Sequence, residues 1–402
     1  GTERFPAQDN LMAYVQRHGG QVNARTSERH TDFFFELSAD TFAGGVERLC
    51  DMLAHPRMNL DEQLREREVL HAEFIAWARE PSAQHQLKLL QPLNPAHPLR
   101  AFHAGNRYSL PIPRQSFQQA LQDFYQAFYQ TGQMSLSLTG PLSVDQLTAL
   151  AEHSCAELRR AETVVQSAPP RLMTDAGPGY QHIDGQHLNL MFAFEQLPPA
   201  SRQALDFLCH WINADKPDGL VARLCQQQLI TNLKAAVLYQ FKGQALLQIE
   251  FSAAAEITQT ATQISEMFYD WLAFFSTQQD WPALREEFRL LQQRQMEVCG
   301  AMELARLDCE QAEGPLSDQA VAALKAILRQ LQPVPVSTCR YTWQLPAANP
   351  FLRAPKEPVS AGLIRGQTSA HRGLRTFAQD RLRSRRDMSA MNFSSGSSSC
   401  KA

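Results

Sequence analysis

The sequence predicts an α+β fold built from two similar α/β units, each with a mostly antiparallel sheet covered by helices. The chain has 402 residues, which is too long for one ordinary hydrophobic core, so two domains are expected. Pairs of strand-like runs alternate with amphipathic helical segments along the whole chain. The order of these elements in the first part loosely recurs in the second, which indicates a duplicated unit.

The first unit begins with a helical segment and a hairpin. Residues 9–18 place apolar side chains at helical spacing and end at Gly19-Gly20, a common C-terminal stop. Residues 21–27 and 31–37 alternate in polarity as strands do, and the polar row of the first is typical of a sheet edge. The other elements expected here are a strand over 134–139 and helices over 41–53, 62–80, 81–90, 116–129 and 143–158.

Residues 116–129 carry an aromatic stripe at helical spacing, formed by Phe117, Phe124, Tyr125 and Phe128. A stripe of this kind is most often buried, so we expect it to belong to the core.

The second unit repeats the mixture of strands and helices. Strands are expected over 188–195, 233–241 and 245–251, and helices over 200–214, 220–228, 258–276 and 281–298. We place the first domain at 1–162, a polar, proline-containing linker at 163–179, and the second domain at 180–352. The basic, serine-rich tail at 353–402 is expected to be disordered.

Charge and cysteine usage exclude several classes of protein. A net charge of −3 argues against nucleic acid or an anionic membrane as the main partner. No apolar run is long enough to span a bilayer. The eight cysteines are scattered and form no C-x-x-C pair. This pattern indicates free thiols in a reducing cytoplasm, and neither a disulfide framework nor a zinc–thiolate site, with a periplasmic location left open.

Two acids stand out in the helix over 62–80. Glu66 and Glu73 are two helical turns apart, so both carboxylates leave the same face. Leu70 lies between them and Val69 beside them, which predicts that this face is partly buried. Two buried acids repel each other and lose hydration unless a cation or a donor network compensates. The alternative is an ordinary solvated, charged helix surface.

Five ordered motifs resemble the N-terminal domain of the pitrilysin and insulin-degrading-enzyme family of zinc peptidases. They are GTERFP, HGGQVNARTS, RHTDFFFEL, REREVLHAEF and NPAHPLRAFHAGN. WQLPAANPFL, at 343–352, resembles the segment that closes the second domain of that family. The resemblance covers residues 1–140 well and 340–352 locally. The opening twenty residues are most similar to the branch that processes a precursor peptide in the biosynthesis of pyrroloquinoline quinone (PQQ).

The resemblance implies an inverted zinc motif, H-x-x-E-H, followed about 75 residues later by a third ligand, a glutamate. Carried over by position, Glu73 is this ligand of Zn²⁺, and Glu66 is the acid that supports it. Zinc held by three protein ligands keeps one position for a water whose pKa falls to about 7. His71 points away from Glu73 around the helix and is excluded, and His30 is expected at a turn or the surface.

The resemblance also assigns the strand at 21–27 to the family's edge strand, which binds the substrate backbone by strand addition. Asn23, Ala24 and Thr26 are the positions that match the family pattern. The alternative for these three residues is ordinary sheet structure.

The chain departs from the family at one important point, because none of its twelve histidines lies in an H-x-x-E-H motif. In the family this motif lies a few residues before GTERF, so we expect the chain to begin just after it, without two ligands and the general base. We therefore expect these 402 residues alone to bind zinc poorly and to cleave nothing. The expected partners are a peptide substrate and either a homologous subunit or the family's C-terminal half.

Two hypotheses about function follow. The first is a fragment of a zinc-dependent endopeptidase that acts on small peptides in an enclosed chamber. The second is a non-catalytic binding or scaffold subunit of the same family that pairs with an active homologue. The presence of both Glu66 and Glu73 favours the first.

Overall fold

The computed structural model describes residues 1–27, 29–102, 104–174, 177, 179–309, 316–332, 340–349 and 352. Contacts divide the chain into a large unit, Gly1–Thr139 with Val144–Ala348, and a small unit, Gly140–Ser143 with Asn349–Ala402. The described helices and strands belong to the large unit. The tail expected to be disordered, 353–402, lies outside the described residues. The domain boundaries placed at 162 and 179 fall inside the large unit and stay a prediction.

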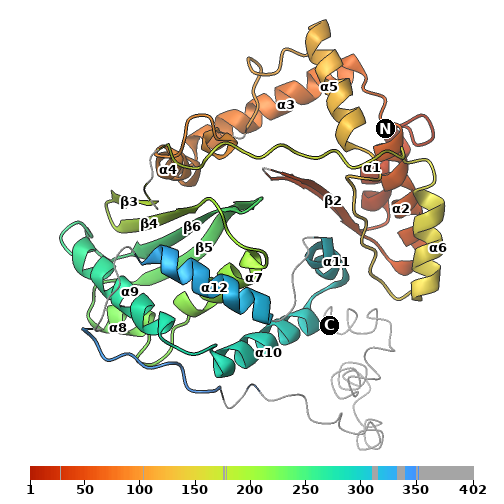
Figure 1. Ribbon diagram of the computed structural model, residues 1–402. Coiled ribbons are helices and arrows are strands. Elements are labelled where there is room, and N and C mark those ends of the chain that lie inside the picture. Colours follow the sequence, from red (N-terminus) through yellow and green to blue (C-terminus); the bar gives the residue numbers. More distant parts are fainter. Residues whose placement is uncertain are drawn as a thin grey trace, which may run out of the picture. The chain divides into compact units, whose positions relative to one another are not determined.

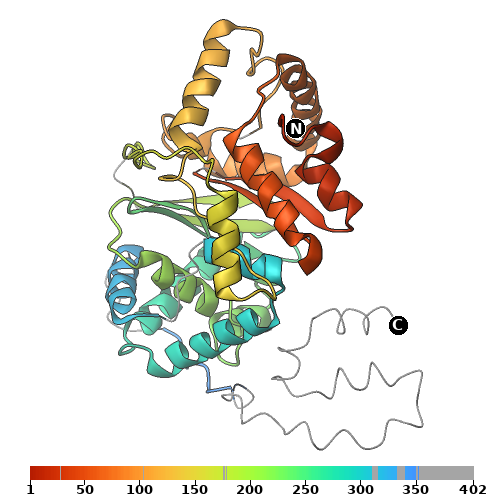
Figure 2. The same cartoon turned by 90° about the vertical axis from the view of Figure 1, so that its right-hand side faces the viewer.

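The first part of the large unit combines a two-stranded sheet with helices. β1 (Gln21–Thr26) pairs antiparallel with β2 (Thr31–Glu36), as the alternating pattern predicted. Leu11, Val15 and Leu49 pack against side chains of this sheet and form a small core. Figure 2 shows this part of the chain, coloured red to yellow, from a second side. The helices are η1 (Ala7–Asp9), α1 (Leu11–Arg17), α2 (Ala39–Ala54), α3 (Leu60–Arg79), α4 (Pro81–Leu90), η2 (Pro98–Arg100), α5 (Gln115–Phe128) and α6 (Val144–Ser154).

The second part is built on a four-stranded antiparallel sheet with the order β3-β4-β6-β5 (Figure 1). Its strands are β3 (Gly179–Asp184), β4 (His187–Phe194), β5 (Asn232–Phe241) and β6 (Gln244–Ser252). Its helices are α7 (Ser201–Ile212), α8 (Leu220–Gln226), α9 (Ala261–Ser276), α10 (Pro282–Val298), α11 (Ala301–Cys309) and α12 (Asp318–Leu331). The α+β class and the antiparallel sheets are confirmed, although the two described sheets differ in strand number.

The two faces of the larger sheet differ in chemistry because side chains alternate along each strand. Leu188, Leu190 and Phe251 lie on the face that packs against α7, α9 and α12, and this layer holds the main core. The opposite face carries His187, Asn189 and other polar residues near the β3–β4 turn. The rest of that face is apolar and packs against residues that follow α4 and against the segment before β3, through Leu93, Leu99, Leu172, Met191, Tyr239 and Leu246.

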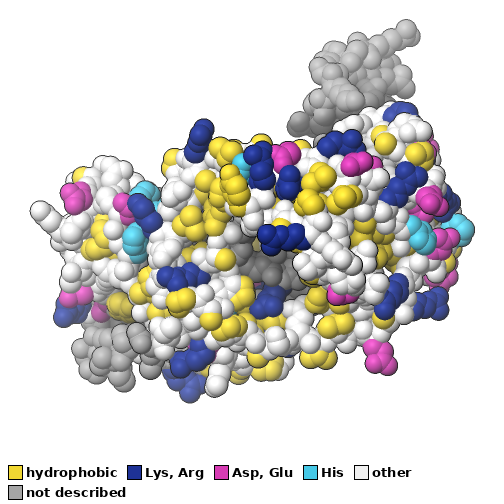
Figure 3. Space-filling model, turned by 90° about the horizontal axis from the view of Figure 1, so that it is seen from above, with side chains coloured by type: hydrophobic (Ala, Val, Ile, Leu, Met, Phe, Trp, Pro, Cys, Tyr) yellow, Lys and Arg dark blue, Asp and Glu magenta, His cyan; other side chains and the backbone are white. Residues whose placement is uncertain are grey.

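Two expectations about the first part are wrong. The strand predicted over 134–139 is not formed, since an alternating run becomes a strand only when a neighbouring edge supplies ladder hydrogen bonds. The helix at 116–129 is present as α5, but no side chain of α5 is buried, so its aromatic stripe is not core. Phe124 is 54% exposed and packs on Phe128, with ring centroids 4.9 Å apart. Hydrophobic side chains remain visible on this side of the molecule in Figure 3.

The structure also contains elements that the sequence patterns did not reveal. These are β3, which begins at the end of the predicted linker, and the helices α11 and α12. Six cysteines are free thiols in the part of the chain that the structure describes. In that same part, no helix is long and apolar enough to cross a membrane.

Candidate functional site

The helix α3 places Glu66 and Glu73 on one face, as predicted, and its start is well defined. The side chain of Asn59 accepts hydrogen bonds from the backbone N–H groups of Asp61 and Glu62 and caps the helix. From there the helix continues without a break to Arg79. The two-turn separation of the carboxylates therefore follows directly from local helical geometry.

The expected partial burial of this face is confirmed only for Leu70, which is half-buried, and no residue of α3 is fully buried. Glu66 and Glu73 are both exposed, and Val69 beside them is 49% exposed. Solvated carboxylates two turns apart repel each other only weakly, so burial gives no reason for a cation here. The assignment of Glu73 as a ligand rests instead on the family resemblance.

The acids of α3 differ in what they contact. The guanidinium of Arg107 donates hydrogen bonds to Glu68, including one of 3.0 Å from Nε, and this bonding lowers the pKa of the Glu68 carboxyl group. The side chains of Glu66 and Glu73 make no hydrogen bond or ion pair with any of the described residues. Their carboxylate oxygens are therefore available to a ligand, whereas those of Glu68 are already engaged.

His71 lies where the sequence placed it, turned away from Glu73. Its ring stacks on Phe74, with centroids 6.5 Å apart, and packs edge-on against Tyr108. The backbone N–H of Arg107 approaches its Nδ1 at 3.5 Å. His30 is exposed beside the β1–β2 turn, as expected.

β1 has one free edge in the part of the chain that the structure describes, because β2 is its only partner strand there. The N–H of Ser27 donates to the carbonyl of His30, which makes these two a hydrogen-bonded pair. Hydrogen-bonded and non-hydrogen-bonded pairs alternate in an antiparallel ladder. Ala24 and Thr26, which pair with Phe33 and Thr31, therefore direct their backbone groups away from β2.

The side chains of the three predicted binding positions are exposed along this strand. Asn23 Oδ1 accepts a hydrogen bond of 2.8 Å from the N–H of Ala24, and the hydroxyls of Thr26 and Thr31 lie 3.1 Å apart. The structure thus provides an accessible strand edge at the predicted positions.

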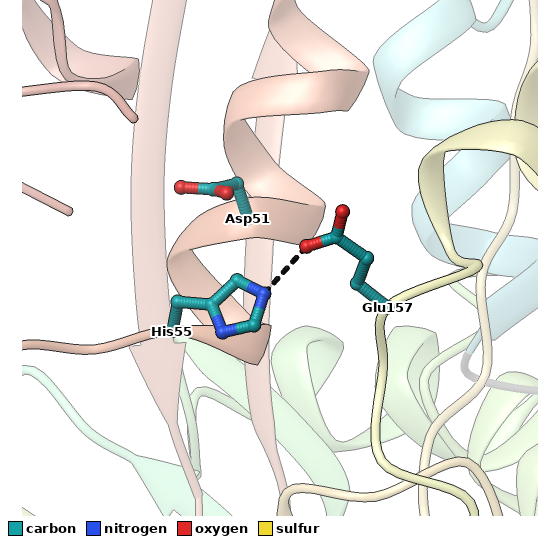
Figure 4. A group of neighbouring side chains, drawn as sticks. All are labelled: Asp51, His55 and Glu157. Carbon is teal, nitrogen blue, oxygen red and sulfur yellow. Dashed lines mark hydrogen bonds and ion pairs between the residues drawn. The ribbon is translucent and has the colours of Figure 1, made fainter. Parts of the chain in front are cut away.

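A cluster of possible metal ligands that the sequence did not reveal lies at the end of α2 (Figure 4). The ligand atoms of Asp51, His55 and Glu157 all lie within 4.8 Å of one another, and this is the only such group among the described residues. His55 Nε2 lies 2.6 Å from Glu157 Oε2, and buried Asp51 accepts a hydrogen bond from the hydroxyl of Thr2. Only the i, i+4 spacing of Asp51 and His55 could have indicated it.

The described residues do not complete a zinc site around Glu73. They provide one carboxylate ligand with a second acid on the same face, whereas catalytic zinc sites have three protein ligands. The cluster at Asp51 contains neither Glu66 nor Glu73.

Comparison with known proteins identifies the class of protein. Residues 1–101 match a family model described as insulinase (peptidase family M16), and residues 116–279 match one described as the peptidase M16 inactive domain. The chain belongs to the M16 peptidase family, as its motifs predicted.

Individual relatives place it more narrowly. The chain is 57% identical over 394 residues to coenzyme PQQ synthesis protein F of Pseudomonas protegens, which covers 98% of this chain and 48% of the relative. It is 52% identical to the protein of that name from Pseudomonas syringae pv. tomato, covering 88% of this chain and 46% of the relative. The chain thus spans about half the length of the curated relatives it matches.

The crystal structure of pitrilysin has the same fold. It superposes with a TM-score of 0.71 at 19% identity, over 89% of this chain and 44% of pitrilysin.

Proposed function

We propose that this chain is part of a zinc-dependent endopeptidase that processes the precursor peptide in PQQ biosynthesis. Relatives named coenzyme PQQ synthesis protein F support the pathway, and membership of the M16 family supports peptide hydrolysis and a zinc cofactor. The observation that carries the proposal is the free carboxylate of Glu73, which matches the family's glutamate ligand.

In this proposal each part of the chain has a separate task. Zinc, when bound, activates a water molecule and polarises the peptide carbonyl. Glu73 would supply one carboxylate oxygen to the metal. Glu66, on the same face of α3, would add a second negative charge beside the ion and support the position of Glu73. The free edge of β1 would align the substrate as an added strand through the backbone groups of Ala24 and Thr26.

The ligand role is tested by Glu73→Gln in the protein as its gene encodes it. Loss of the carboxylate charge should lower peptidase activity, and the affinity of the Glu73 site for zinc, by at least tenfold. Asp61→Asn is a matched control, because Asp61 is an exposed acid of the same helix on a different face. Undiminished zinc and activity in the Glu73 variant would remove Glu73 from the site.

The strand-addition role is tested by Ala24→Pro. This N–H points away from β2 and donates to the Asn23 side chain, which must release it when a substrate strand binds. Proline there therefore removes a donor for the substrate without removing a ladder bond to β2. Peptide affinity should fall roughly tenfold, the value of one lost hydrogen bond of about 1.4 kcal/mol, while the unfolding transition stays close to that of the parent. If β1 is ordinary sheet structure, peptide affinity will not change.

The second candidate is a non-catalytic subunit of the same family that binds peptide and pairs with an active homologue. Its support is the match of residues 116–279 to the inactive-domain model and the lack, among the described residues, of a complete ligand set around Glu73. Measuring peptidase activity of the natural protein alone and after mixing with an M16 homologue separates the two. Activity only in the mixture, unaffected by Glu73→Gln, favours the subunit.

A further inference from the structure

Three histidines from three elements meet on the polar face of the four-stranded sheet. His85 comes from α4, His182 from β3 and His187 from β4. The centroid of the His85 ring lies 6.1 Å from that of His182 and 6.0 Å from that of His187. The ladder pairs His182 with Asn189 and Asp184 with His187, so all four side chains share one face. Figure 3 shows histidines beside acidic and basic side chains on the side where α4 and the β3–β4 hairpin lie.

Carboxylates lie beside two of these rings. His187 Nδ1 lies 3.2 Å from Glu250 Oε1 and 3.2 Å from the hydroxyl of Ser252. His85 Nδ1 lies 3.7 Å from Asp184 Oδ2, an oxygen that also lies 3.5 Å from Lys88 Nζ. Histidines that bind metals usually have a carboxylate on one ring nitrogen and the metal on the other. In both rings the second nitrogen, Nε2, has no hydrogen bond among the described residues.

The third histidine carries the clearest sign of a missing ligand. His182 Nε2 is buried and has no hydrogen-bond partner, and the same is true of Nδ2 of the neighbouring Asn189. Asn189 is fully buried, and only its Oδ1 is engaged, by Gln248 at 2.7 Å. Buried polar atoms without partners are rare in folded proteins and often lie beside a water molecule or an ion. Here the unpartnered nitrogen belongs to a good metal ligand.

We propose that His85, His182 and His187 bind a divalent transition-metal ion of the Zn²⁺ type, at a site independent of Glu73. With zinc–nitrogen distances of about 2.1 Å, three imidazoles in a tetrahedral site have centroids roughly 5 Å apart. The observed 6.1 and 6.0 Å from His85 to the other two rings therefore require His85 to approach each of them by about 1 Å. The three ligand nitrogens do not all lie within 4.8 Å of one another, so side-chain rotation must bring them together around the ion. The bound ion links α4 to the β3–β4 hairpin, and the charges of Asp184 and Glu250 offset both the ion and Lys88.

The Asp51–His55–Glu157 cluster is a weaker candidate, although its ligand atoms are closer together. His55 and Glu157 already form an ion pair, and the Asp51 carboxylate is already bound by the hydroxyl of Thr2. A metal there would have to replace existing contacts. The Nε2 atoms of His85, His182 and His187 have no such contacts among the described residues.

The test is a calorimetric titration of the tag-free 402-residue chain with Zn²⁺ alone. The expected result is binding of one equivalent, with affinity reduced at least tenfold by His182→Ala and by His85→Ala. His85 is on the surface helix, so its variant keeps the proposal testable if the His182 variant is unstable. Glu250→Gln, which removes only the carboxylate behind His187, should weaken binding 10- to 100-fold. X-ray absorption at the zinc edge should report imidazole nitrogen ligands.

Three controls separate this site from the alternatives. Glu73→Gln, His55→Ala and the exposed His153→Ala should all bind Zn²⁺ as the parent chain does. Parent-like binding by both the His182 and His85 variants would overturn the proposal. Loss of binding in the His55 or Glu73 variant, with the histidine variants unaffected, would assign the metal to those residues instead.

Discussion

At the residue scale, the environment of a cysteine decides whether its thiol can react. Cys50 is 2% exposed in α2, and its Sγ lies 3.6 Å from that of Cys155. Burial, together with the neighbouring Cys155, raises the pKa of the Cys50 thiol to about 12. Burial also raises the pKa of Cys209 to about 12. Since the thiolate is the reactive form, both should be nearly inert at neutral pH.

We predict that iodoacetamide at pH 8 modifies exposed Cys309 well before Cys50 or Cys209 in the folded chain. Peptide mapping by mass spectrometry as a function of time measures the three rates. In urea the three rates should converge, because unfolding removes the burial that raises the pKa. Equal rates in the folded chain would contradict the described environment of Cys50.

The raised pKa values of Cys50 and Cys209 also make the free energy of unfolding depend on pH in the alkaline range. A thiol whose folded pKa is raised favours the folded state while both states are protonated. This stabilisation is present below the unfolded pKa near 9 and is lost as pH rises towards about 12. The free energy of unfolding should fall over this range, and it should fall less steeply in Cys209→Ala, as urea titrations at several pH values would show. An equal slope in the variant contradicts this linkage.

At the element scale, α3 depends on its cap because it buries no side chain. A helix without a buried face gains little from packing, so local terms carry more of its stability. Asn59 satisfies two backbone N–H groups of its first turn. Gln63 of α3 and Gln118 of α5 exchange amide hydrogen bonds, one of them 2.8 Å long.

We predict that Asn59→Ala destabilises the protein by about 1 kcal/mol, the usual value of an N-cap. Hydrogen exchange should show the loss as faster opening of the first turns of α3. Asn59→Asp is the matched control and should retain most of the stability, since aspartate caps helices equally well. If the alanine variant exchanges as slowly as the parent, tertiary contacts and not the cap hold this helix.

At the scale of the whole molecule, residues distant in sequence hold the last described segment in place. The buried carboxylate of Asp270 in α9 accepts hydrogen bonds from Trp343 Nε1 at 2.7 Å and from the backbone N–H groups of Arg340 and Tyr341. Trp343 is 5% exposed, and the guanidinium of Arg223 lies 4.8 Å above its ring. The WQLP motif therefore closes the core around α9.

We predict that Asp270→Ala destabilises the protein by about 3 kcal/mol, because it leaves three donors without their charged acceptor. Limited proteolysis should then cut within 340–349 faster than in the parent. Trp343→Phe removes one donor and keeps the aromatic ring, so it should lose only about 1 kcal/mol. Equal losses in the two variants would mean that packing of the ring, and not the carboxylate, holds the segment.

A buried histidine links the η2 region to the larger sheet. His97 is 2% exposed, its Nδ1 accepts the N–H of Leu99 at 3.2 Å, and its Nε2 lies 3.2 Å from Gln244 Oε1. These partners suit the neutral ring, since a protonated Nδ1 could not accept a hydrogen bond. Burial lowers the pKa of His97 below its usual 6.5.

A lowered histidine pKa means that the unfolded chain binds the proton more readily than the folded one. The stabilisation is complete above pH 6.5 and is lost as pH falls from there towards the folded pKa. We predict that the free energy of unfolding decreases over this range and that His97→Gln reduces the slope. Urea unfolding at pH 7.0, 6.0 and 5.5 measures it, with exposed His153→Gln as the control. A slope unchanged in the His97 variant contradicts the prediction.

Much of this protein was determined by the sequence itself. Helical periodicity and caps predicted most helices of both parts, and strand-like runs predicted β1, β2 and three strands of the larger sheet, because these signals are local. The two-turn spacing of Glu66 and Glu73 is local in the same sense, whereas the free edge beside Asn23, Ala24 and Thr26 depends on which strands pair with β1.

Only the tertiary structure decided which faces are covered. The exposure of Glu66, the unburied Phe124 and the missing strand at 134–139 depend on whether another segment packs or pairs with them, which no local pattern encodes. The convergence of His85 with His182 and His187 has the same cause. These residues are far apart in the chain, and only the fold brings α4 onto the sheet face that carries the other two.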